Sequence, residues 1–301
     1  MKVFASCHNH SNFSDAEYSP EQLVQIAHDL GHGGIILTDH DTVSGTYFIN
    51  KAARKLGMKS ILGCEFSTRF DGIPIHLLGF DFNPDQADMK KLLEYCPSIQ
   101  TSRSEVMFRL GLERGSLREG ITWQDVRDAF PYNDYICNNQ VFEVMVAKGI
   151  YKREEYEDQF FKPNFSSKLG LRDYIKEVTG KSSDQIKTED VIRVIRKAGG
   201  VPIVAHPAGK EHLAQKLIDC GAMGFETRHS IFRPERNHGG EESRLFFEKL
   251  CNEKGLYKMG GSDHEGVLGG YLAYGDEYYC PEELSGISEE DFMKIYERKL
   301  G

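Results

Sequence analysis

Histidine and carboxylate side chains recur directly after short apolar runs in this chain of 301 residues. His8 and His10 are one residue apart after the first apolar run, and Asp15 follows five residues later. Imidazole and carboxylate groups together suit zinc, manganese or iron. A single His-x-His pair is a weak sign of a metal site, so its meaning depends on what the rest of the chain supplies.

Further groups of the same types occur in or directly after other apolar runs, which we predict to be strands. They are His40 between Asp39 and Asp41, then Glu65, His76, His206, Glu226, His229 and the run Asp263-His264-Glu265. In parallel α/β folds the carboxyl ends of the strands lie on one face, so these groups are expected to meet there. So many suitable groups at strand ends favour a metal cluster over chance. The other histidines, His28, His32, His212 and His238, fall on predicted helices or loops and are interpreted as ordinary polar groups.

Segments with helical periodicity separate several of the apolar runs. Residues 19–31 begin with Ser19 as a helix N-cap before Pro20, and residues 188–199 begin with Thr188 as a predicted N-cap. Alternation of strands and helices favours a parallel sheet or barrel. Strand-like runs disappear in the middle of the chain. We therefore predict an α/β core formed by residues 1–94 and 190–301, with a helical insertion, residues 95–189, covering the active site.

Composition excludes several classes of protein. The chain has 37 basic and 46 acidic residues, a net charge of −9, which argues against long nucleic acid as a partner. The apolar runs are too short to span a bilayer, and the N-terminus lacks the apolar region of a signal peptide, so a cytoplasmic protein without a membrane partner is expected. The seven cysteines form no C-x-x-C pair, which indicates reduced, structural thiols.

The segments HNHSNFSD, TDHDTVSG, GCEFS, IHLLGF, AHP and GGSD together resemble the PHP family, named for polymerase and histidinol phosphatase. The resemblance covers about residues 1–94 and 190–275 and is greatest to members similar to the 3′,5′-nucleoside bisphosphate phosphatases. It implies an α/β fold, a distorted (β/α)7 barrel. It also implies two or three divalent metal ions, with manganese, zinc or iron as the candidates and magnesium possible.

The resemblance also implies a role for each ligand. One ion would be held by His8, His10, Glu65 and Asp263; a second by Glu65, as a bridge, with His76 and His206; and a third by Asp15 and His40. Relatives complete the third site with an Asp-x-His motif, where this chain carries Glu265. His264 is the alternative ligand, because successive side chains of a strand point to opposite faces.

The substrate contacts depart from the family. Relatives that cleave nucleotides often carry Arg-x-His where this chain has Asn138 and Gln140, and neutral amides bind phosphate less strongly than arginine does. Arg228, His229 and Lys168 are the other candidates for substrate binding. We expect a hydroxide that bridges two metal ions to attack phosphorus. His229 is the expected general acid, and Asp39 is expected to orient a metal ligand.

The predicted activity is hydrolysis of a small phosphorylated molecule, first of all a nucleotide. The favoured reaction converts a 3′,5′-bisphosphonucleoside into a nucleoside 5′-monophosphate and phosphate, for example AMP and phosphate. A cyclic phosphodiester, histidinol phosphate and the 5′ end of short RNA are alternatives within the same class. A PHP module with structural metals and no activity is the non-enzymatic alternative. It is disfavoured because all but one of the expected ligand positions keep the expected residue type.

Overall fold

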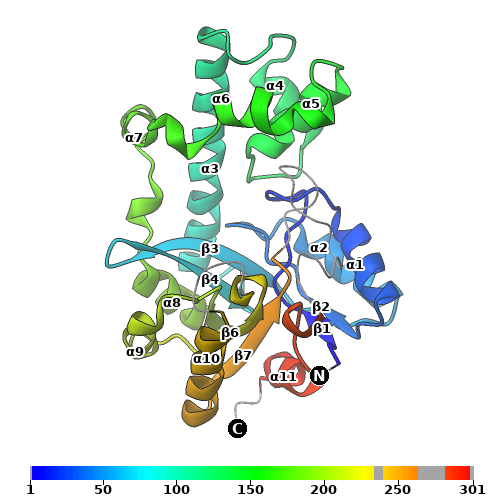
Figure 1. Cartoon of the computed structure of the whole chain (residues 1–301), viewed down its shortest axis with the longest axis vertical. Helices are drawn as coiled ribbons and strands as arrows, with labels where there is room; N and C mark the ends of the chain where they lie inside the picture. Colours follow the sequence, from blue (N-terminus) through cyan, green and yellow to red (C-terminus); the bar gives the residue numbers. More distant parts are fainter. Residues whose placement is uncertain (1, 234–239, 264–281, 299–301) are drawn as a thin grey trace.

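The computed structural model describes residues 2–233, 240–263 and 282–298 (Figure 1). Its strands are β1 (Ala5–Ser6), β2 (Gly34–Ile35), β3 (Gly63–Phe70), β4 (Ile73–Phe80), β5 (Val201–Val204), β6 (Gly224–His229) and β7 (Tyr257–Gly261). Its α-helices are α1 (Pro20–Asp29), α2 (Thr46–Lys55), α3 (Ala87–Glu113), α4 (Trp123–Ala129), α5 (Asn138–Ala147), α6 (Lys162–Asn164), α7 (Arg172–Thr179), α8 (Thr188–Lys197), α9 (Ala214–Asp219), α10 (Gly240–Lys254) and α11 (Glu289–Tyr296). Short 3-10 turns include η3 (Ser167–Leu169), η4 (Ser183–Gln185) and η6 (Ser230–Phe232).

The main sheet is mixed rather than parallel, which corrects the expectation from the sequence. Its strand order is β3-β4-β5-β6-β7, with antiparallel pairing of β4 to both β3 and β5 and parallel pairing from β5 to β7. β3 and β4 form a hairpin whose two-residue turn, Asp71-Gly72, has positive φ at both positions. That backbone matches the twist of the flanking strands, so the hairpin is locally determined.

Strands β1 and β2 form a separate parallel pair that is linked to both ends of the main sheet. The Cys7 N–H donates to Gly260 O at 3.0 Å beside β7, and a parallel bridge joins His40 to Glu65 in β3. The α/β class is therefore confirmed, and closure of the strands into a seven-stranded barrel stays a prediction.

Helices cover the outer side of the sheet and bury its apolar side chains. Phe66, Leu77 and Phe225 on the strands pack in one buried cluster with Ile195 of α8 and Phe247 of α10. Burying such side chains supplies most of the stability of a fold of this kind, at about 1.5–3 kcal/mol for each of them. The sheet that carries the polar groups at its strand ends is therefore a firmly packed support.

Two helix starts test the predicted caps. Ser19 caps α1: its hydroxyl accepts from the Gln22 N–H, and its own N–H donates to Gln22 Oε1. Thr188 does not cap α8, because the N-cap is Lys187 and Thr188 is the first helical residue. Instead, the buried Thr188 Oγ1 lies 2.7 Å from Thr68 Oγ1, and this hydrogen bond ties α8 to β3.

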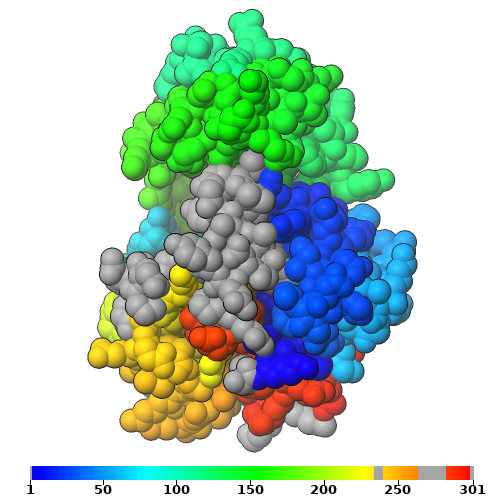
Figure 2. Space-filling model, turned by 45° about the vertical axis from the view of Figure 1, so that its right-hand side comes forward, coloured from blue at the N-terminus to red at the C-terminus, as the bar shows by residue number. Residues whose placement is uncertain are grey.

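The middle of the chain forms a helical unit at one end of the molecule, drawn in green in Figure 2. It has its own buried core, which includes Met107, Phe142 and Phe160. Helix α3 runs without a break through residue 95, the expected boundary. Its first turns bury Met89 and Cys96 against the sheet, whereas its last turns enter the helical core.

Two predictions from composition can be compared with the described residues. Six cysteines lie among them, all as free thiols, and Cys7 and Cys64 are buried in the core; Cys280 lies outside the described residues. Within the same part of the chain, no helix combines the length and the apolar composition that crossing a bilayer requires.

Candidate metal centre and active site

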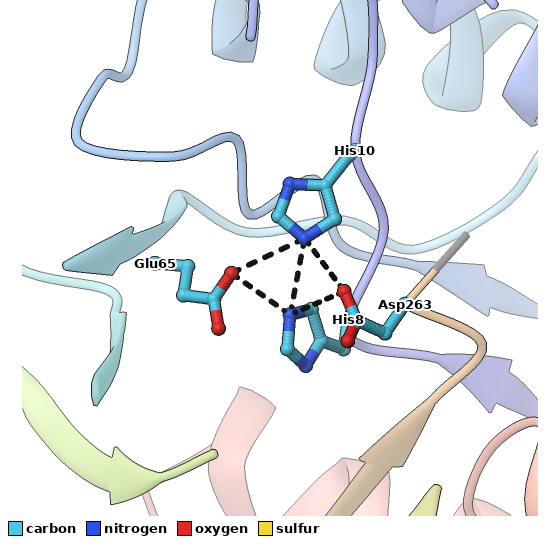
Figure 3. Close-up of side chains that lie close together, drawn as sticks. All are labelled: His8, His10, Glu65 and Asp263. Carbon is cyan, nitrogen blue, oxygen red and sulfur yellow. Dashed lines mark hydrogen bonds and ion pairs between the residues drawn. The ribbon is translucent and has the colours of Figure 1, made fainter. Parts of the chain in front are cut away.

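Four side chains from three separate parts of the sequence, His8 and His10, Glu65, and Asp263, point at one another in the interior (Figure 3). His8 Nε2 and His10 Nε2 are 3.2 Å apart, and each lies 3.2 Å from Glu65 Oε2. Asp263 Oδ1 lies 3.3 Å from His8 Nε2 and 3.0 Å from His10 Nε2. These separations are close to the distance of about 3.4 Å between ligand atoms that share one tetrahedral zinc ion.

Glu65 lies at the centre of a larger group of histidines. Its Oε2, which faces His8 and His10, also lies 3.2 Å from His40 Nδ1. Its Oε1 lies 3.0 Å from both His76 Nδ1 and His206 Nε2. The two oxygens thus face two different sets of imidazoles, which is the arrangement that a carboxylate bridging two ions requires.

The hairpin and the strand ends explain this convergence. Ser67 and His76 are opposite each other in the β3–β4 register, so Glu65, two residues before Ser67, shares a face with His76. Asp41, His206 and Asp263 have positive φ values of 58°, 29° and 48°, a conformation that residues other than glycine seldom adopt. The chain therefore turns sharply at the strand ends around the cluster, as backbones commonly do at functional sites.

A loop between His10 and Asp15 forms the outer side of the cluster. Asp15 Oδ1 lies 3.6 Å from His10 Nδ1, and Asp15 Oδ2 lies 3.5 Å from His40 Nε2. Asp39 supports this loop: its carboxylate accepts hydrogen bonds from the Ser11 N–H and the hydroxyls of Ser11 and Ser14, at 2.6–2.7 Å. Asp39 thus orients the loop that carries Asp15.

Strand β6 contributes two further groups through an irregularity in its pairing. Residues 226 and 229 would face opposite sides of a regular strand, but the ladder to β7 skips one residue between Glu226 and Arg228. Glu226 Oε1 consequently reaches His8 Nδ1 at 3.0 Å, while His229 Nε2 lies 3.0 Å from Asp263 Oδ2. A carboxylate behind a histidine fixes its ring and makes the opposite nitrogen a better metal ligand.

The charges in the cluster depend strongly on one another. Burial alone would raise the pKa of Glu65, but His8, His40 and His76 hold it well below its usual range. Burial alone would lower the pKa of His8, but the carboxylates of Glu65, Asp263 and Glu226 raise it well above the usual range. The histidines respond differently, since burial lowers the pKa of His40 and lowers that of His206 to about 4.

The residues present fit divalent ions. Glu65 Oε2, His10 Nδ1 and His40 Nδ1 are buried and make no hydrogen bond of acceptable geometry within the described structure. Leaving buried polar atoms without partners is costly, and an ion among them would remove that cost. Imidazole nitrogens and carboxylate oxygens are ligands that zinc, manganese and iron all accept.

Proton competition gives a testable prediction for metal binding. His8 and His10 both have raised pKa values: for His10, burial opposes the shift and Asp263 and Glu65 cause it. Below its pKa an imidazole carries a proton that a metal ion must displace, so we expect Mn²⁺ affinity to increase from about pH 6 to about pH 8. Calorimetry in buffers of different ionisation enthalpy would detect the released protons. Identical binding heats in all buffers would contradict this assignment.

Of the predicted substrate contacts, His229 lies in the cluster, whereas Arg228, Asn138 and Gln140 make other contacts. Arg228 faces α10 and η9 (Glu282–Leu284), where it lies 3.5 Å from Glu248 and donates to Glu283 O at 3.3 Å. Gln140 is 2% exposed; its Nε2 donates to Ser14 O, and its Oε1 accepts from the Cys137 N–H. The Asn138 amide donates to Tyr156 Oη.

These contacts occupy amide N–H groups of both residues, and a role for either residue in substrate binding stays a prediction. Arg228 is likewise directed at an acidic partner, because it follows the irregularity that turns its neighbours Glu226 and His229 toward the cluster. Lys168 lies exposed in η3, and no described contact places its ammonium group at the metal ligands. His264 and Glu265 lie outside the described residues.

Two groups at the site were not assigned a role from the sequence. Glu226 orients His8. In the sequence, only its position after an apolar run indicated that it could lie at the site. Lys210 follows His206 closely, its Nζ donates to His206 O at 3.5 Å, and burial lowers its pKa against the opposing charge of Glu65. A lysine in a loop after a strand has no distinctive pattern, so only the structure reveals it.

The helical unit reaches over the same site. Asp134 Oδ1 accepts from the Thr42 and Ser44 hydroxyls at 2.5 and 3.0 Å, and the Tyr135 ring stacks on His40 with 6.3 Å between centroids. Asn133 Nδ2 donates to Asn12 O at 2.7 Å in the loop before Asp15. Residues 133–140 thus hold one wall of the cluster in place.

A mixed α/β fold with a buried cluster of histidines and carboxylates at its strand ends suits a metal-dependent hydrolase. Residues 6–101 match the family model described as the PHP domain. The chain is 30% identical to the 5′-3′ exoribonuclease Rnm of Salmonella typhimurium, over 95% of this chain and 92% of that protein. The chain therefore belongs to the PHP family, and it is a metal-dependent phosphoesterase.

Two further comparisons describe its similarity to known proteins. The chain is 24% identical to the 3′,5′-nucleoside bisphosphate phosphatase of Chromobacterium violaceum, over 85% of each protein. A solved structure from Bifidobacterium adolescentis, assigned as a metal-dependent phosphoesterase, superposes with a TM-score of 0.69 at 22% identity. That superposition covers 99% of this chain and 96% of the other, which supports the fold.

Proposed function

We propose that this chain hydrolyses the P–O3′ bond of a 5′-phosphorylated nucleotide. A 3′,5′-bisphosphonucleoside that loses its 3′-phosphate breaks this bond. A 5′-phosphorylated RNA that releases its first nucleotide as a 5′-monophosphate breaks the same bond, with a second nucleoside attached to phosphorus. The proposal thus joins the activities in the names of the two relatives, the exoribonuclease and the bisphosphate phosphatase.

The observation that carries the proposal is the convergence of imidazoles on the two oxygens of Glu65. We propose that divalent ions are held there by the groups assigned from the sequence: His8, His10, Asp15, His40, Glu65, His76, His206 and Asp263. When bound, such ions make water more acidic, neutralise phosphate oxygens and align the reacting groups. Manganese, zinc or iron fits these ligands.

Protein groups would handle the leaving oxygen and the phosphate charge. His229 Nδ1 accepts the Ile231 N–H at 2.8 Å, so the exchangeable proton of a neutral ring resides on Nε2, beside Asp263. We propose that this Nε2–H donates a hydrogen bond to O3′ as the P–O3′ bond breaks, and that the proton which O3′ gains comes from the attacking water. Lys210, next to His206, is placed to pair with an oxygen of the transferred phosphoryl group.

Short RNA is the second candidate substrate beside the bisphosphonucleoside. It is favoured by the 30% identity to an exoribonuclease along nearly the whole chain. A net charge of −9 disfavours long RNA, because extended phosphate backbones bind basic surfaces. A few nucleotides at a 5′ end need only a local basic pocket.

A substrate panel tests the proposal. Purified protein with Mn²⁺ is assayed on 3′,5′-bisphosphoadenosine, AMP, histidinol phosphate, a cyclic phosphodiester and a short 5′-phosphorylated RNA. We expect AMP and phosphate from the bisphosphate, or 5′-monophosphates from the RNA. The His8→Ala variant should lose this activity, whereas the exposed control His28→Ala should keep it. Turnover confined to histidinol phosphate or the cyclic ester, or no turnover by protein that holds metal, would overturn it.

A further inference from the structure

A cavity of about 570 Å³ lies between β3 and the helices α3 and α7. Its inner end adjoins the metal-ligand cluster, because its lining includes Asp41 and Ser67. Ser67 lies opposite His76 in the hairpin, and its N–H donates to Asp41 Oδ1 at 2.9 Å. Tyr135, whose ring stacks on His40, is also part of the lining. A molecule in this cavity could therefore extend from the cluster into the space below the helical unit.

The cavity is strongly basic, although the chain as a whole is acidic. Arg69, Arg103, Arg172 and Lys181 line it, and Asp41 at the inner end is the only acidic residue in the described lining. Arg69 and Arg172 share one carboxylate, Asp184, which lies 2.7 Å from Arg69 Nε. The walls thus carry more positive than negative charge.

Arg103 and Lys181 supply the charge that the protein does not neutralise. Arg103 donates to Gln100 Oε1 at 3.3 Å and to Phe165 O at 3.5 Å, whereas Lys181 Nζ donates to Ser102 Oγ at 3.1 Å. Neither cation has a carboxylate within 4.0 Å in the described part of the chain. Both are only partly buried, so an incoming anion can reach them.

We propose that this cavity binds the 5′-phosphate of the substrate, with Arg103 and Lys181 as its ligands, while the 3′-phosphate lies at the metal cluster. This inference rests on the proposed function and names how the substrate is recognised. Arginine offers a planar fork of donors to phosphate, and lysine adds a mobile charge. Ile99, Met107 and Ile175 form an apolar wall suited to a base or ribose. The volume lies within the range of about 300–1,000 Å³ typical of small-molecule sites.

The experiment compares two substrates that differ only in the 5′-phosphate: 3′,5′-bisphosphoadenosine and 3′-AMP. The measured quantity is the ratio of kcat/KM for the bisphosphate to kcat/KM for 3′-AMP. We expect Arg103→Gln and Lys181→Gln each to lower this ratio by about 10- to 100-fold, the usual effect of losing a charged hydrogen bond. Arg109→Gln is the matched control, because Arg109 is exposed on the same helix and pairs with Glu105. Its ratio is expected to equal that of the wild type.

A binding measurement separates this inference from the proposed function. AMP keeps the 5′-phosphate and lacks the reacting group, so calorimetry with AMP and with adenosine reports on the cavity without turnover. We expect both variants to weaken AMP binding at least tenfold and to leave adenosine binding unchanged. If neither substrate is cleaved but AMP binding still depends on Arg103, the proposed function fails and the phosphate site stands. If both substrates are cleaved but the ratio and AMP binding are the same in wild type and variants, the phosphate site is wrong.

Discussion

Glu65→Gln is expected to lower kcat/KM for phosphoester hydrolysis by at least about 10³-fold and to reduce the bound metal. The substitution keeps the shape of the side chain but removes a charge that faces five imidazoles through two oxygens. An amide offers only one oxygen ligand and cannot bridge two ions. A loss of 10³ corresponds to about 4 kcal/mol of transition-state stabilisation, which is a reasonable share for one central ligand.

Kinetics and elemental analysis of the same preparation measure both effects. Glu290→Gln is the control, because Glu290 is exposed and its described partner is Lys294. Its activity and metal content should match those of the wild type. A Glu65→Gln protein that keeps its metal and more than about a tenth of its activity would show that Glu65 is not the central ligand.

Gly261→Ala is expected to destabilise the fold and to disturb the metal centre by displacing the backbone of His8. A Cβ atom on Gly261 would lie 2.3 Å from the His8 backbone N and 2.6 Å from its Cβ. Neither atom is the far end of a flexible side chain, so the strand must shift and carry His8 with it. Overpacking of this kind usually costs about 1–3 kcal/mol, and we expect at least the upper end here because backbone must move.

Thermal unfolding and metal content would measure this effect. In domains of about 150–250 residues, each kcal/mol of lost stability lowers the melting temperature by about 2–4 °C. A loss of about 3 kcal/mol should therefore lower it by at least about 6 °C. Gly115→Ala is the control: Gly115 has a φ of +66° and open space around it, so alanine there adds only backbone strain of about 1–2 kcal/mol. Equal losses in the two variants, with normal metal content in Gly261→Ala, would refute the close-approach argument.

The residues that gather in the cluster were predictable because their chemistry and their position both stand out. His8, His40 and Asp263 follow short apolar runs, and residue types that bind metals are rare at so many strand ends by chance. Glu226 had the same signal but a different role, since it supports His8 from behind. The type of residue therefore indicated the site, while the arrangement of nitrogens and oxygens required coordinates.

The strand order was less predictable, although one local signal was present. Asp71-Gly72 between two apolar runs is a typical hairpin turn, and it indicates the antiparallel pair that the expected parallel sheet lacked. The pairing irregularity in β6 has no such signal. It turns His229 toward the cluster and leaves Arg228 beside Glu248, so the two neighbours have different surroundings.

The basic cavity was beyond sequence reasoning for a different reason. Its cations come from β3, α3, α7 and the segment before η4, which are spread over more than a hundred residues. Each of them alone resembles an ordinary surface charge. Only the packing of the helical unit against β3 brings Arg69, Arg103 and Lys181 to one cavity.

The central claim, water attack on phosphorus with cleavage of the P–O3′ bond, can be tested directly by isotope labelling. The protein hydrolyses 3′,5′-bisphosphoadenosine with Mn²⁺ in water enriched in oxygen-18. The products are then separated, and their masses are measured by mass spectrometry. We predict one labelled oxygen in inorganic phosphate, unlabelled AMP with its 5′-phosphate intact, and no reaction after chelation of the metal. Labelled AMP with unlabelled phosphate, release of the 5′-phosphate instead, or undiminished hydrolysis after chelation would contradict the account.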